Sequence, residues 1–426
     1  MHLESIHAMN FRRFGDVRVT LQPGFNLLIG DNQSGKTSAL DAICIGLGTF
    51  FLGFRTGNRP SLLSTDVRRS VHLVGGKSEM PAQYPTEVTC QIDFKGSKLI
   101  GGYSLGAADS NPIAIGELEH IGRQFDISMQ NGEALDLPVF AYFGTERVTR
   151  HSRAEPSEKD ENISDRSLGY FECLSRESNP ALIQWWIWRQ TIAEYQQAQR
   201  NIPKTAAEPL RGIERAICRC IPEVTQFFYD SEFSELTVVF GDKRRLPWSM
   251  LSDGVRSLMM LAMDLSWRAC VLNPHLGNEA PERSTGIVLI DEIDLALHPT
   301  WQRRITDDLQ RAFPQLQFIA TTHSPQVIGS SEQARVQLIE GDVVTLVPHP
   351  YGKDSNTVLT DVMGASERDD LIMQLFEKVN NYIAGRKWDE ARSELSKLGG
   401  KIDSLDTEIV RLRARIDFMS RAAERK

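Results

Sequence analysis

The sequence predicts an α/β fold in which helices alternate with the strands of a parallel sheet. Short apolar runs predict buried strands, and the segments between them have helical periodicity. The parallel strands expected in chain order are residues 25–29, 236–240, 287–290 and 318–320. A second group, in which alternate residues Val88, Cys90, Ile92 and Phe94 share one face, predicts an antiparallel side sheet.

The composition is that of a soluble globular protein. Apolar residues make up 41% and charged residues 24% of the 426 residues, which excludes fibrous and disordered classes and allows roughly three structural units. The longest charge-free apolar stretch, residues 42–54, is shorter than the roughly 18 residues of a membrane-spanning helix. Glu4 interrupts the N-terminal segment, so we expect no signal peptide, a cytoplasmic protein and no membrane partner. The net charge of −8 leaves DNA binding undecided.

Residues 1–150 are expected to form the N-terminal lobe of a globular α/β domain, which we call the head. Residues 25–47 predict a buried strand, a loop and a helix packed on a sheet. Residues 138–143 predict another buried strand, which is closed by residues 144–147 (GTER).

Three further parts are expected after this lobe. Residues 151–235 should hold an exposed linker, marked by dense charge at 152–166, and an inserted helical subdomain over 168–220. Residues 236–360 should complete the head as its C-terminal lobe. Residues 361–426 should form a C-terminal helical or coiled-coil region.

This C-terminal region has the most regular periodicity in the chain. Its apolar residues recur in steps of three and four, the a/d pattern of a coiled coil: Leu395, Leu398, Ile402, Leu405, Ile409, Leu412, Ile416 and Met419. Gly399 and Gly400 predict a hinge or a helix start. The helix could pair with another helix or a partner, which we favour slightly, or dock on its own domain.

Residues 30–37 (GDNQSGKT) match the phosphate-binding P-loop pattern G-x-x-x-x-G-K-[ST], after a buried strand and at the start of a helix. The backbone N–H groups of such a loop wrap phosphates, Lys36 neutralises the β and γ phosphates, and Thr37 holds Mg²⁺. A chance match is the alternative, and the strand–loop–helix context argues against it. The candidate nucleotide-binding residues are Asn32, Gln33, Ser34, Gly35, Lys36, Thr37 and Ser38.

Two later strands end in polar residues that would complete such a site. The run 286–290 is followed by Asp291 and Glu292, which predicts Asp291 in the Mg²⁺ shell and Glu292 as the base for the attacking water. The run 318–322 ends in His323, which is suited to contact the γ-phosphate or the water. Acidic pairs at strand ends are common as solvated turns, but the upstream P-loop favours the catalytic interpretation.

Residues 251–256 (LSDGVR) precede an apolar helix over 258–270. Taken alone, this segment predicts a helix N-cap in which Ser252 or Asp253 bonds free amides. The order of the motifs, however, resembles the ABC-type ATPase heads of the SMC, Rad50 and RecF group. In that group the signature segment opens a helix whose N-terminus covers the γ-phosphate on the opposite head. The resemblance therefore implies that Ser252, Asp253 and Gly254 bind ATP held by a second copy.

The sequence departs from that pattern at three positions. Asp253 stands where the signature has its first glycine, and Arg256 also differs from the usual residue. His298 stands in the loop after the Asp291–Glu292 pair where transporter-like heads have an aspartate. These departures leave the contacts with a second copy open.

Other segments resemble the Septu-type PtuA ATPases of bacterial anti-phage operons: residues 137–147, 351–356 and 363–368. Residues 10–14 (NFRRF) are similar to the start of RecF-like heads. The Septu resemblance implies a PtuB-like HNH nuclease as partner. We expect this partner to dock on the a/d seam of residues 395–419 or on the preceding helix around Phe376, Val379 and Ile383. We expect no nuclease centre in this chain, since no H-N-H arrangement follows Asp294.

A single chain has one P-loop and one signature segment, so the resemblance implies at least a homodimer with two composite ATP sites. The expected activity is ATP hydrolysis that controls the nuclease partner. Two alternatives stay open: a RecF-like repair ATPase that binds DNA, and a defence scaffold that binds ATP and barely hydrolyses it. The trigger, the nucleic acid that is cut, the oligomer number and the direction of control are not predicted.

Overall fold

The computed structural model describes residues 1–55, 59–75, 77–148, 166–201, 206–366 and 368–424. They form two compact units, residues 1–358 and residues 359–426. The predicted parts 1–150, 151–235 and 236–360 lie in the first unit except at its C-terminal edge. The linker predicted at 152–166 lies outside the described residues, except for Arg166.

The first unit is built on a six-stranded sheet in the order β16-β15-β3-β14-β13-β9. Its strands are β3 (Phe25–Ile29), β9 (Val139–Phe143), β13 (Gly286–Ile290), β14 (Leu316–Thr321), β15 (Arg335–Glu340) and β16 (Val343–Leu346). All neighbours are parallel except β15 and β16. The residues of β3, β9, β13 and β14 are all buried, as expected for parallel strands covered on both faces. The predicted α/β fold is confirmed.

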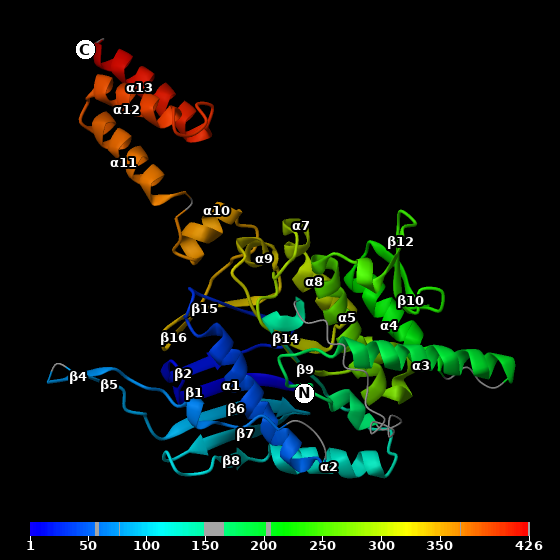
Figure 1. Cartoon of the computed structure of the whole chain (residues 1–426). Helices are drawn as coiled ribbons and strands as arrows, with labels where there is room; N and C mark the ends of the chain where they lie inside the picture. Colours follow the sequence, from blue (N-terminus) through cyan, green and yellow to red (C-terminus); the bar gives the residue numbers. More distant parts are fainter. Residues whose placement is uncertain (56–58, 76, 149–165, 202–205, 367, 425–426) are drawn as a thin grey trace. The chain divides into compact units, whose positions relative to one another are not determined.

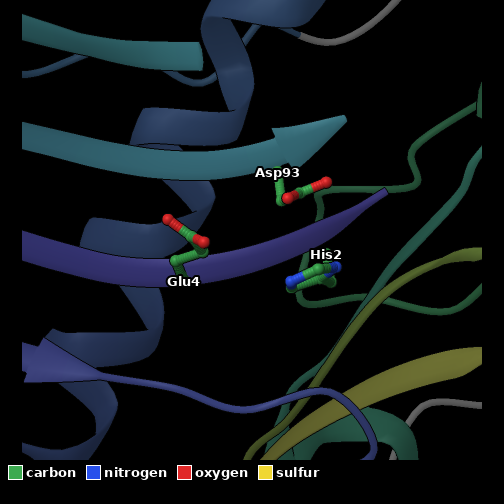
Figure 2. Close-up of side chains that lie close together, drawn as sticks. All are labelled: His2, Glu4 and Asp93. Atoms are coloured by element: carbon green, nitrogen blue, oxygen red, sulfur yellow. The ribbon is translucent and has the colours of Figure 1, made fainter. Parts of the chain in front are cut away.

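The predicted antiparallel side sheet is also confirmed, with strand order β2-β1-β6-β7-β8. Its strands are β1 (His2–Phe11), β2 (Phe14–Thr20), β6 (Thr86–Phe94), β7 (Ser97–Leu105) and β8 (Ile113–Gly116). At one end, His2 and Glu4 on β1 lie beside Asp93 on β6 (Figure 2). The pairing of β1 with β6 places His2 opposite Asp93, and the Glu4 carboxylate already accepts a hydrogen bond from Gln91 (2.9 Å) and pairs with Lys98 (3.1 Å).

Helix α1 (Lys36–Gly48) contacts strands of both sheets, which explains why nearly all of its residues are buried (Figure 1). Helix α5 (Asp253–Leu272) is buried from Ser257 onward and packs against α4 (Ala207–Cys220) and β9. The other helices and short strands of this unit are β4 (His72–Val74), β5 (Lys77–Glu79), α2 (Leu118–Gln130), α3 (Pro180–Gln199), α6 (Ala280–Arg283), α7 (Pro299–Gln302), α8 (Ile305–Ala312), α9 (Pro325–Ser330) and α10 (Ser355–Thr357). Within the described residues, no helix combines the length and apolar character needed to cross a membrane.

The prediction that residues 236–240 belong to the parallel sheet is wrong. They form β11 (Glu235–Phe240), the middle strand of a separate antiparallel sheet with β10 (Val224–Asp230) and β12 (Arg245–Pro247). The connections on both sides of β11 span only four residues each, whereas a parallel crossover needs a dozen or more. The helices predicted in the insertion are present as α3 and α4, but strand β10 lies in the range assigned to the insertion.

The described residues of the second unit include the helices α11 (Asp370–Ala384), α12 (Trp388–Gly399) and α13 (Thr407–Glu424). They share a core formed by Phe376, Val379, Ile383, Ala391, Leu395, Leu398, Ile409, Leu412 and Ile416. Five seam residues are therefore covered from within the chain, and the prediction that they pair with an outside helix is wrong. The same core covers Phe376, Val379 and Ile383, which corrects their assignment as a docking surface. The physical reason is the break at residues 400–406, which lets α13 pack against α12.

Two seam residues give a matched test of this arrangement. Ile409 is fully buried, whereas Leu405 is 78% exposed in the break between α12 and α13. Ile409→Lys should reduce the free energy of unfolding of this unit by about 3–5 kcal/mol, the range for an unpaired buried charge. Leu405→Lys should change it by no more than about 0.5 kcal/mol. Hydrogen exchange of residues 370–424 in the full chain measures both, and equal losses would contradict the three-helix core.

Candidate nucleotide-binding site

The predicted site residues lie at the carboxyl ends of three neighbouring strands. Because β3, β14 and β13 are adjacent and parallel, the loops that follow them meet at one edge of the sheet, where α/β proteins bind ligands. These loops line a cavity of about 430 Å³. The lining residues are Arg12, Arg13, Asn32, Gln33, Gly35, Lys36, Thr37, Ser38, Asp291, Glu292, Thr321 and His323.

The P-loop is shaped for a close approach to a ligand. Gly35 has φ of 104°, and a Cβ atom there would lie 2.5 Å from the ring of Phe14, so only glycine fits. Helix α1 begins at the next residue, and its N-cap, Gly35, has no side chain that could cap the first turn. The first-turn N–H groups are thus available to an anion, as in other helix N-termini that bind phosphate.

Lys36 is 7% exposed at the base of this loop. Its Nζ donates to the carbonyl oxygens of Gly30 and Asp31, both at 2.8 Å. Burial lowers the pKa of Lys36, and the nearby carboxylate of Asp291 offsets part of this effect. Ser34, the one residue of the candidate set 32–38 that does not line the cavity, is buried beside Lys36, with its Oγ 3.5 Å from Nζ.

Asp291 and Thr37 form a set of oxygen ligands. The Thr37 hydroxyl donates to the Asp291 carboxylate at 3.0 Å, and Thr321 donates to the same carboxylate at 2.7 Å. Hydroxyl and carboxylate oxygens are the ligands that Mg²⁺ prefers, and they stand here beside the phosphate-binding loop. The residues present therefore fit a bound Mg²⁺.

Glu292 and His323 face the same cavity from the ends of neighbouring strands. Glu292 has a positive φ of 49°, and its N–H donates to the Thr321 hydroxyl at 2.7 Å. Its carbonyl oxygen accepts a hydrogen bond from Arg147 at 2.5 Å. The backbone of Glu292, a residue that lines the cavity, is thus held from two sides.

The signature residues are placed differently. Ser252 and Asp253 are exposed at the start of α5, and Ser252, Asp253 and Gly254 are not among the described residues that line the cavity. Ser252 is the N-cap of α5, but its side chain does not make the predicted capping bond to this helix. The neighbouring Asp253 pairs with Arg256 at 3.3 Å. Gly254 abuts the loop after β13, since a Cβ atom there would lie 2.6 Å from the carbonyl oxygen of Ala296.

The loop after β13 is tied to the strand that carries His323. The Thr322 hydroxyl donates to Asp294 at 2.5 Å. His298, which replaces the transporter-type aspartate, is the N-cap of α7 and accepts from the N–H of Thr300. This histidine therefore has a structural explanation within the chain.

Sequence reasoning did not assign Arg12, Arg13 or Thr321 to the site. Arg12 pairs with Asp41 on α1 and with Asp66 at 2.9 Å, and Asp41 also binds Arg176 and the Tyr142 hydroxyl. The similarity of residues 10–14 to the start of RecF-like heads was the available signal for the two arginines. Thr321 carried no signal, because a threonine at the end of a buried strand is common.

The parallel sheet, the antiparallel side sheet, the P-loop and the acidic pair after β13 define an ABC-type ATPase head. The family model "RecF/RecN/SMC N terminal domain" matches residues 2–343, so the chain belongs to that family. The predicted P-loop fold of the ABC and SMC head type is confirmed.

Three comparisons show which proteins this chain is similar to. It is 23% identical over 437 residues to the "Retron Vc95 probable ATPase" of Vibrio cholerae, covering 90% of this chain and 84% of that protein. It is 42% identical over 351 residues to the "Septu protein PtuA" of Bacillus mycoides, covering 81% of this chain and 40% of that protein. The solved structure of an SMC head bound to the C-winged helix domain of ScpA matches with a TM-score of 0.52 at 15% identity, over 82% of this chain and 97% of that one. The predicted resemblance to Septu-type ATPases is thus confirmed.

Proposed function

We propose that this chain binds ATP with Mg²⁺ in the cavity between the P-loop and the ends of β13 and β14, and hydrolyses it to ADP and phosphate. The observation that carries this proposal is the convergence of Lys36, Thr37, Asp291, Glu292 and His323 on one cavity. Thr37 and Asp291 would hold the Mg²⁺, which neutralises phosphate charge when bound.

The remaining groups have separate tasks in this proposal. The loop N–H groups and Lys36 bind and orient the phosphates. Glu292 accepts a proton from the attacking water, and His323 contacts the γ-phosphate or that water. The test is ATP turnover by the purified chain compared with its Glu292 and Lys36 variants, as set out in the Discussion.

We further propose that two copies form two composite sites. Support comes from the position of Ser252, Asp253 and Gly254, which open α5 at an exposed end and do not line the cavity of their own chain. A group that acts on ATP from there would act on ATP held by another copy.

Ser252→Arg tests the composite site. A bulky cation at this exposed position should leave ATP binding by the same chain within about twofold, because Ser252 lies outside its cavity. It should abolish ATP-dependent dimerisation and reduce turnover by roughly 10²-fold or more, by misplacing the second copy. Light scattering with and without ATP measures the assembly. A monomeric wild-type protein with full turnover would contradict the proposal.

In the cell, we propose that nucleotide state controls a partner HNH nuclease in bacterial anti-phage defence. The similarity to the Septu protein PtuA supports this role, and the cytoplasm would be its compartment. Co-expression with an HNH protein encoded beside this chain should give a complex whose cutting of DNA or RNA depends on Glu292. A neighbouring HNH protein that neither binds nor responds to nucleotide would remove this part of the proposal.

The RecF alternative is favoured by the family itself, which includes RecF. DNA binding that needs ATP and weakens steeply with salt, in the absence of any nuclease partner, would support it. ATP retained through purification with negligible turnover would instead support the scaffold alternative.

A further inference from the structure

Arg147 lies in the short 3-10 segment after β9, in residues 144–147 (GTER), to which sequence analysis assigned no chemical role. It is only 7% exposed. Its Nη1 donates to the carbonyl oxygens of Gly144 (2.9 Å) and Asp291 (2.7 Å), and its Nη2 donates to that of Glu292 (2.5 Å). Its Nε lies 3.3 Å from the Ser257 hydroxyl on α5. One guanidinium thus bonds the backbone of the catalytic pair and the helix that carries the signature residues.

These contacts depend on the shape of the arginine. A guanidinium directs its N–H groups in a planar fork, whereas a lysine ammonium is a point charge that cannot reach the same acceptors together. Burial lowers the pKa of Arg147 to about 10, so the group is still protonated at neutral pH. Burial opposes the charged form of the guanidinium, and the nearby carboxylates of Asp291, Asp294 and Glu292 favour it.

The backbone that Arg147 holds is itself in an unfavourable conformation. Glu292 has a φ of 49°, in the left-handed region that residues other than glycine rarely adopt. The Thr321 hydroxyl accepts from the N–H of Glu292, and Arg147 donates to its carbonyl oxygen. Without the guanidinium, one of these two restraints is lost, and the carboxylate of Glu292 is free to shift.

Ser257, the residue of α5 that Arg147 contacts, lies close to the signature segment. Ser257 is one helical turn after Asp253 on α5 and is 3% exposed. The same end of α5 is in close contact with the loop after β13, through Gly254 and Ala296. The start of α5 therefore contacts the loop after β13 through Gly254, and it is linked through Arg147 to the backbone of Asp291 and Glu292.

We propose that Arg147 is a positioning residue that fixes Glu292 for proton abstraction and ties its placement to helix α5. This inference rests on the proposed ATPase function and adds to it a residue outside the nucleotide cavity. Removing the hydrogen bonds of Arg147 should lower kcat. ATP binding should stay intact, because Arg147 does not line the cavity.

The test compares Arg147→Lys with Arg166→Lys in the full chain. Arg166 is a matched control, since it also donates to three backbone carbonyls, those of Glu133, Leu135 and Leu272, none of which lines the cavity. Arg147→Lys should lower kcat by about 10- to 100-fold, the range for a catalytic group misplaced by about 1 Å. The dissociation constant for ATP should stay within about twofold of wild type. Arg166→Lys should leave kcat within about twofold of the wild-type value, even if it lowers the thermal midpoint of unfolding as much as Arg147→Lys does.

Ser257→Ala gives a milder second variant if Arg147→Lys folds poorly. It keeps the carbonyl bonds of Arg147 and removes the tie to α5, so kcat should fall severalfold with unchanged ATP affinity. In the double variant the two effects should be less than additive, because both act through one guanidinium.

Wild-type kcat in both Arg147→Lys and Ser257→Ala would overturn the inference while the ATPase proposal stands. A fall in kcat matched by Arg166→Lys at the same loss of thermal midpoint would also overturn it. A wild-type chain without any turnover would instead remove the ATPase proposal, and the inference with it.

Discussion

Lys36→Ala should abolish detectable ATP binding. The side chain is nearly buried beneath the loop and supplies the fixed positive charge that faces the β and γ phosphates. Its loss leaves the carboxylate of Asp291 at the same cavity without that cation. Equilibrium binding of labelled ATP measures the effect.

A matched control for this prediction is Lys98→Ala. Lys98 is an exposed lysine of the side sheet that pairs with Glu4 and does not line the cavity. Its removal should leave the dissociation constant for ATP unchanged. Wild-type affinity in Lys36→Ala would show that the P-loop match is accidental.

Glu292→Gln should slow ATP hydrolysis by about 10²–10⁴-fold, the range for a positioned general base. The amide keeps the size of the side chain and the backbone bonds to Thr321 and Arg147, but it cannot accept the proton of the attacking water. ATP binding should therefore persist, and the closed dimer should accumulate.

Single-turnover hydrolysis beside light scattering measures both effects. Glu279→Gln serves as the control, since Glu279 is an exposed carboxylate paired with Arg283 at 3.3 Å. If turnover is unchanged in Glu292→Gln, the base must lie elsewhere, and His323 is the next candidate because it lines the same cavity.

Much of the site could be predicted because its functional residues lie in short contiguous segments of the sequence. The spacing of Gly30, Gly35 and Lys36 directly after a buried run specifies a strand, a phosphate loop and a helix. Asp291 and His323 likewise follow buried runs, and adjacent parallel strands bring their ends together.

The wrong predictions, for the a/d seam and for residues 236–240, depended on contacts between segments that are distant in the sequence. The a/d pattern around Ile409 shows that one helix face is apolar, but it does not show which surface covers that face. Residues 236–240 have the same apolar character in an antiparallel strand as in a parallel one, so only the short connections could have indicated the hairpin arrangement.

Arg147 was beyond sequence reasoning for a related reason. Its acceptors include three backbone carbonyls, which every residue has, and Asp291 and Glu292 are far from it along the chain. No residue type or spacing marks such a contact, whereas the fold places β9 beside β13 and brings Arg147 to the acidic pair.

The central claim, that each ATP site is completed by a second copy, is tested most directly by mixing two impaired variants. Lys36→Ala has a defective P-loop and an intact signature, and Ser252→Arg has the reverse. A mixed dimer contains one site with both parts intact. Our account predicts that ATP turnover, lost in Lys36→Ala and reduced by roughly 10²-fold or more in Ser252→Arg, rises well above both levels when the two variants are combined. A mixture no more active than its components, under conditions where wild-type copies dimerise and hydrolyse ATP, would contradict it.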